Sequence, residues 1–161
     1  MKRTFNLIVI LSLFAQICHA QTIKTEEEYK VFYDSIVTRL QSVEKDSSSY
    51  FGKPFSEFVK QLDKYGLKII RVRKDTYDKQ LYPKHLYSIF ITFTTVELEY
   101  FADDHKWEQP IVSIYFKESL PYEKALSLRR KYNSYFGKEV EKFYSGAVIE
   151  SVHFAFMKGY L

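Results

Sequence analysis

The densest group of side chains with acid, base or metal-ligand character lies between residues 103 and 108. It holds two adjacent aspartates, a histidine and a glutamate, with the only tryptophan of the chain among them. Carboxylates can bind hard metal ions, and two carboxylates can act as acid and base in hydrolysis. The candidate binding residues are therefore Asp103, Asp104, His105, Trp107 and Glu108.

The same segment can also be interpreted as a tight turn. Asp residues favour turns because their side chains accept hydrogen bonds from the nearby backbone, and residues 103–106 separate two stretches that we expect to be strands. The spacing of the acidic and histidine residues matches no metal-binding or catalytic signature. We therefore favour the turn, predict no catalytic residue, no metal and no other cofactor, and assign the five residues to binding only.

Aromatic rings offer a second kind of chemistry. The chain carries 14 Tyr and 14 Phe, and Trp107 with nearby tyrosines and carboxylates could form a platform for a sugar ring. Most rings fall on periodic positions, which favours a core that is rich in aromatic residues. Glycan binding therefore stays an alternative. Neither His85 nor His153 belongs to a nucleophile motif, and His153 alternates with Val152 and Phe154, which predicts that it points away from the core.

Two helices are expected at the N-terminal side of the chain. Thr25 and Glu28 have the spacing of a capping box, and the apolar residues that follow at spacings of three and four predict a helix over residues 25–44. Pro54 indicates the first turn of a second, shorter helix, and Gly66 is placed to end it.

Four strands are expected after these helices. The apolar residues change from odd to even positions after residue 93, which predicts a bulge or break near Thr94 and Thr95, with Val96, Leu98 and Tyr100 beyond it. Residues 103–106 would then form the turn of an antiparallel hairpin. The predicted strands are residues 67–74, 87–93, 111–117 and 148–156, the last with Val148, Val152, Phe154 and Phe156 facing the core.

A third helix is expected before the last strand. Ser119 and Pro121 begin it, and its apolar residues continue to about Tyr135. The predicted fold is therefore α+β, with an antiparallel sheet of about four strands packed against two N-terminal helices and a third helix inserted before the last strand. Residues 49–53 recur identically as residues 134–138, but the first copy precedes a predicted helix and the second ends one, so we favour coincidence over duplication.

The first twenty residues have the pattern of an export signal. Lys2 and Arg3 precede an apolar run over residues 5–17, and Ala20 is a small residue suited to signal peptidase. The run is shorter than the roughly 20 residues that span a bilayer. We therefore expect cleavage after Ala20, a mature single domain over residues 21–161 without a transmembrane helix, and a periplasmic or secreted location.

Cys18, the only cysteine, lies within that segment. Lipidation of Cys18 would give an outer-membrane lipoprotein, but the bulky Ile17 before it departs from the usual motif, so we favour cleavage. The loss of Lys2 and Arg3 would lower the formal charge of +4 by two. Nearly balanced charge and export both argue against a nucleic-acid partner, despite basic runs at residues 68–74 and 129–131.

One segment carries a family resemblance. Residues 50–59, with the sequence Tyr-Phe-Gly-Lys-Pro-Phe-Ser-Glu-Phe-Val, precede Leu62, Gly66 and a predicted strand. This segment resembles the lead-in of small exported bacterial proteins of unknown function, and the layout is similar to the SmpA/OmlA outer-membrane assembly lipoproteins and to the β-lactamase-inhibitor-protein fold. The third helix and the poor lipidation motif depart from that pattern. The resemblance implies a role in binding or envelope assembly without catalysis.

The expected function is therefore that of an exported, non-catalytic module that binds another envelope or extracellular protein. The alternative is a carboxylate-based hydrolase or a glycan-binding protein. That alternative requires the carboxylates of residues 103–108 to meet Glu97, Glu99 or His153 around a cleft.

Overall fold

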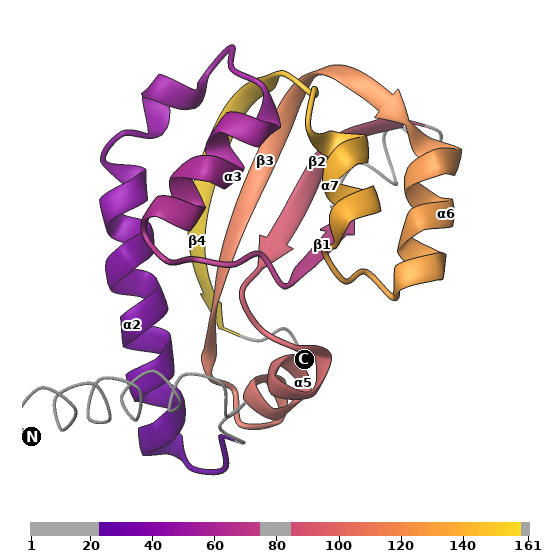
Figure 1. The fold of residues 1–161 in the computed structure, drawn as a ribbon. Coiled ribbons are helices and arrows are strands. Elements are labelled where there is room, and N and C mark those ends of the chain that lie inside the picture. Colours follow the sequence, from indigo (N-terminus) through magenta and orange to yellow (C-terminus); the bar gives the residue numbers. More distant parts are fainter. Residues whose placement is uncertain (1–22, 75–84, 159–161) are drawn as a thin grey trace, which may run out of the picture.

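The computed structural model describes residues 23–74 and 85–158 (Figure 1). The expected export signal, residues 1–20 with Cys18, lies outside the described residues. Four strands form one sheet, in which every pair of neighbours is antiparallel and the spatial order follows the chain. They are β1 (Arg71–Lys74), β2 (His85–Thr92), β3 (Glu108–Pro121) and β4 (Ile149–Lys158).

Helices cover one face of this sheet and one of its ends. In Figure 1, α3, α6 and α7 lie in front of the sheet, α2 runs along its β4 side, and α5 lies beyond the end of β2. The predicted α+β fold class is thus confirmed. The helices are α2 (Glu26–Glu44), α3 (Phe55–Lys64), α5 (Val96–Asp104), α6 (Tyr122–Tyr132) and α7 (Lys138–Tyr144), with a short 3-10 helix, η2 (Ser47–Tyr50).

The strand register separates an apolar face from a mixed one. On the opposite face from the core, Phe90, Ser113 and His153 stand side by side, and His153 is exposed, as predicted. The core face packs against α2, α3, α6 and α7 through aliphatic and aromatic side chains. Two of its rows are Val72, Ile91 and Val112, and Ile89, Ile114 and Val152, all of them buried.

The predicted ends of the first two helices are confirmed. Thr25 and Glu28 form the capping box of α2, and Pro54 precedes the first residue of α3. Gly66 has a φ of 69°, in the left-handed region that glycine adopts at low cost. The amide of Leu67 donates to the carbonyl of Leu62 at 2.9 Å. This bond satisfies a carbonyl at the end of α3.

The prediction that residues 96–100 lead as a strand into a hairpin turn at residues 103–106 is wrong. The break near Thr94 and Thr95 exists, but Thr95 caps a helix there, because its hydroxyl accepts from the amide of Leu98. Asp103 and Asp104 consequently end α5, and the turn at His105 and Lys106 connects this helix to β3 rather than one strand to another, although β2 and β3 do pair as expected. Alternation over only five residues is too short to establish a strand, and the capping threonine decides in favour of the helix.

The first and last strands also differ from their predictions. Residues 67–70 stay outside β1, because β2 ends at Thr92, opposite Arg71. In β4, Ser151 pairs with Tyr115 and Ile149 with Phe116, which leaves Glu150 as an extra residue. This bulge reverses the alternation, so that Ile149 is fully buried and Val148 is 37 % exposed. Val152 and Phe154 face the core as predicted, and the side chain of Phe156 lies outside the described part.

The third predicted helix is shorter than expected. It ends at Tyr132, because Asn133 and Ser134 adopt left-handed backbone angles, and a separate helix, α7, follows. The repeated pentapeptide therefore has more similar surroundings than the sequence indicated. Residues 49–53 lead into α3, and residues 134–138 lead into α7. Within the two described ranges, no helix is both long enough and apolar enough to cross a membrane.

Candidate functional site

The five candidate residues lie around the junction between α5 and β3. Asp103 and Asp104 end α5, His105 caps it, and Glu108 begins β3. They do not converge on one point. Instead the structure divides them among an aromatic stack, a tyrosine pair and a buried polar network.

Trp107 belongs to the aromatic stack. Its ring centroid lies 4.8 Å from that of Tyr29 and 4.7 Å from that of His105, at interplanar angles of 29° and 30°. Phe101 meets the indole edge-on, at 5.3 Å. These contacts join the start of α2 to the end of α5, so the indole serves packing between elements.

Glu108 is held by two tyrosines of α2. The hydroxyl of Tyr29 donates to the Glu108 carbonyl at 2.6 Å, and the hydroxyl of Tyr33 donates to Glu108 Oε2 at 2.7 Å. Burial, with the nearby acidic groups, raises the pKa of both tyrosines, so the hydroxyls stay protonated donors. Together with Trp107 these residues line a hollow of about 270 Å³.

Asp103 is half-buried while Asp104 is exposed. The side-chain amide of Gln109 donates to Asp103 Oδ1. Burial, followed by the charge of Glu99, raises the pKa of Asp103. The neighbouring Gln109 also donates to the backbone carbonyl of Glu99 at 3.2 Å, so Asp103 belongs to the polar network that surrounds Glu99.

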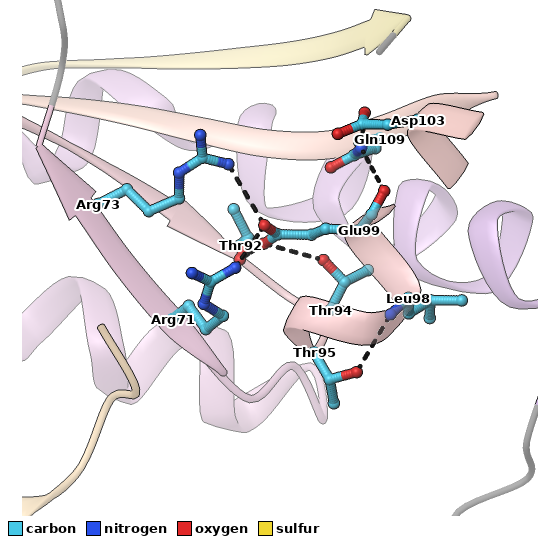
Figure 2. A network of polar contacts seen from close by, with 9 residues as sticks. All are labelled: Arg71, Arg73, Thr92, Thr94, Thr95, Leu98, Glu99, Asp103 and Gln109. Carbon is cyan, nitrogen blue, oxygen red and sulfur yellow. Dashed lines mark hydrogen bonds and ion pairs between the residues drawn. The ribbon is translucent and has the colours of Figure 1, made fainter. Parts of the chain in front are cut away.

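Glu99 is the central residue of that network, a role that its sequence context did not predict. It is only 5 % exposed. Its Oε2 accepts from Arg71 and, at 3.3 Å, from Arg73, both on β1. Its Oε1 accepts from the hydroxyls of Thr92 at 2.8 Å and Thr94 at 3.4 Å. Figure 2 shows all four donors directed at this carboxylate.

This arrangement makes Glu99 an anchor rather than a catalyst. A carboxylate has about four lone-pair positions, and four side-chain donors already contact the two oxygens of Glu99. It therefore has no vacant position from which to take a substrate proton. Its partners lie on β1 and at the end of β2, so Glu99 fixes α5 against the end of the sheet.

The signal for this network was present in the sequence but ambiguous. Arg71 and Arg73 occupy alternate positions of a strand, so both side chains point to one face. Glu99 and Asp103 are four residues apart, which places them on one face only if the segment is helical. The assignment of residues 96–100 to a strand hid that relation.

An apolar groove lies between α5 and α2, with a volume of about 660 Å³. Val31 of α2 is 72 % exposed at this groove. Leu98 forms part of the opposite wall and points away from the Glu99 carboxylate in Figure 2. Glu27 and Glu28 add acidic side chains at the start of α2. The other lining residues are Ile23, Phe32, Ser35, Ile70, Phe93, Thr94 and Thr95.

Glu99 positions one wall of this groove. Thr94 both lines the groove and donates to Glu99, and Thr95 lines it and caps α5. Leu98 is the neighbour of Glu99 in the chain. Because the carboxylate is fixed to β1 and β2, the groove wall formed by residues 94–98 is fixed with it.

Over residues 23–74 and 85–158, no three acidic, histidine or cysteine side chains are grouped so that they could hold a metal ion. Comparisons of the chain with protein-family models, curated proteins and solved structures found no match. The function is therefore inferred from the geometry of the groove and of the residues that support it.

Proposed function

We propose that this protein is a non-catalytic binding module for another envelope or extracellular protein, and that the groove between α2 and α5 is its docking surface. The groove itself carries the proposal. A contiguous exposed apolar surface with a polar rim is typical of an interaction site, and here Val31 of α2, Leu98 of α5 and Phe93 line one groove. Its volume also lies in the range of ligand-binding clefts.

The position of Val31 supports this proposal. An amphipathic surface helix places polar residues on its exposed side, yet Val31 is the most exposed large apolar residue among the described positions. It lies beside Phe32 and opposite Leu98. A partner that covered these side chains would remove apolar surface from water, which is the main favourable term in protein association.

The absence of catalysis is part of the proposal, and the state of the carboxylates supports it. Glu99 accepts from four side chains, Glu108 accepts from Tyr33, and Asp103 accepts from Gln109. Each is engaged by neighbours in the fold. The export of the protein and its cleavage after Ala20 belong to the same proposal, because they would bring the groove into contact with proteins of the envelope or the exterior.

A glycan-binding role is the second candidate, and the hollow of about 270 Å³ beside Trp107 and Glu108 favours it. Sugar recognition by stacking requires an open ring face. Tyr29 and His105 already contact the indole at small interplanar angles. The protein-binding proposal therefore rests on the larger and more apolar surface.

The test is affinity capture from the cell envelope with a substitution inside the groove and one outside it. Val31→Asp places a charge on the groove wall, and its high exposure should leave folding intact. Phe51→Asp is the matched control, because Phe51 is also exposed but lies outside the groove. We expect one stoichiometric partner to be recovered by the wild type and by Phe51→Asp and to be lost with Val31→Asp. Equal recovery by both variants would refute the proposed surface.

A further inference from the structure

We infer that the element docking in this groove is an amphipathic α-helix with a basic residue beside its apolar face, rather than an extended strand or a flat surface. This inference rests on the proposed docking function of the groove. Three properties of the groove lead to it: the state of its polar groups, the arrangement of its walls, and the charge on its rim.

Several polar groups of the groove lining are already engaged within the fold. At Ile70 on the floor, the amide donates to Thr92 at 2.9 Å and the carbonyl accepts from Phe136 at 2.8 Å. Thr94 donates to Glu99, and Thr95 accepts from Leu98. The α2 wall is a helix, whose interior backbone groups bond to one another.

An occupant must therefore satisfy its own backbone. Unpaired amide and carbonyl groups of an extended segment would be costly against these apolar side chains. A helix forms its backbone hydrogen bonds internally and presents only side chains to the groove. The groove therefore favours a helix over an extended strand, because a strand would need a free sheet edge with which to form its backbone hydrogen bonds.

The walls have the geometry that a docked helix requires. The α2 wall consists of residues on one side of the helix from Glu27 to Ser35, which at 1.5 Å per residue is roughly 12 Å, or two turns. Leu98 of α5 forms the opposite wall. The lining residues all lie outside the four strands, so a helix docked here would pack against α2, α5 and the residues that connect β2 to α5.

The rim gives the occupant its charge. Glu27 and Glu28 both line the groove in the first turn of α2. One oxygen of Glu28 accepts from the amides of Lys24 and Thr25, and both glutamates are exposed. A Lys or Arg at the edge of the docked apolar face would complement these charges and favour the correct orientation of the helix.

The experiment compares two displayed peptide libraries on the protein purified after expression with its own leader. In one library the randomised positions lie on the outward face of a stable helical hairpin, and in the other they lie on the edge strand of a stable β-hairpin. Selected binders are then titrated against the wild type, Val31→Asp, Glu27→Lys and the control Phe51→Asp.

The inference predicts binders from the helical library, with apolar residues at spacings of three and four and an adjacent Lys or Arg. Their affinity should fall about tenfold or more with Val31→Asp, fall measurably with Glu27→Lys, and stay unchanged with Phe51→Asp. Binders from the strand library that are sensitive to Val31→Asp would overturn the helical occupant while leaving the docking surface intact. Binders with acidic flanks would overturn the charge assignment. If neither library yields a binder sensitive to Val31→Asp, the proposed function itself fails.

Discussion

Replacing Glu99 with Gln should destabilise the protein strongly, because it removes the charge that two arginines and two threonines share. Arg71 is the decisive partner, since its side chain is only 11 % exposed, whereas that of Arg73 is 46 % exposed. A buried charge left without its partner costs about 3–5 kcal/mol, while a pair open to solvent contributes little. The Gln oxygen can still accept from the threonines, so we expect the lower end, about 3 kcal/mol.

The assay is urea unfolding at neutral pH followed by circular dichroism, with thermal unfolding as a second measurement. A loss of that size in a domain of this length corresponds to a fall in Tm of roughly 6–12 °C. The slope of the free energy of unfolding against urea should not change, because the same surface is exposed. The matched control is Asp104→Asn, an exposed carboxylate on the same helix, which should leave the midpoint nearly unchanged.

A double variant isolates the pair. Arg71→Met combined with Glu99→Gln should cost less than the two single substitutions added together, because the arginine charge no longer lacks its partner. Two results would refute the reasoning: a Glu99→Gln protein no less stable than Asp104→Asn, or a double variant whose loss equals the sum of the singles.

Three further predictions concern the junctions around the site. Burial raises the pKa of Asp103 in the folded protein. Protonation of Asp103 therefore contributes fully to the free energy of unfolding below the ordinary pKa of 3.8, and this contribution is lost as the pH rises through the higher folded pKa. Asp103→Asn should flatten this fall in stability, measured as urea midpoints across acidic pH. Gly66→Ala should cost about 1–2 kcal/mol in thermal unfolding because of the left-handed backbone, whereas Gly146→Ala should change little, since its surroundings are open. Tyr33→Phe removes the hydrogen bond to Glu108 and should cost about 1 kcal/mol in urea unfolding.

Elements whose signals are local could be predicted from the sequence. The capping box of Thr25 and Glu28, the glycine that ends α3 and the alternation in β2 each depend on neighbouring residues only. The predicted sheet and its helices followed from these patterns. Local signals of this kind do not depend on which strand lies beside which.

The groove and its support could not be predicted in the same way. Residues 96–100 alternate well enough for a strand, and only the hydrogen bond from the Leu98 amide to Thr95 reveals the start of a helix. The partners of Glu99 come from β1 and β2, so their meeting depends on strand register. The bulge at Glu150 likewise results from pairing between β3 and β4. These features are consequences of tertiary structure.

The central claim is that the groove between α2 and α5 is a docking surface, and site-specific photocrosslinking in intact cells tests it most directly. A benzophenone amino acid at position 31 would lie on the groove wall, and the same group at position 51 would be exposed elsewhere on the surface. We predict a discrete crosslinked product of higher mass from position 31, and none of that mass from position 51. No product from position 31, or the same product from both positions, would contradict the claim.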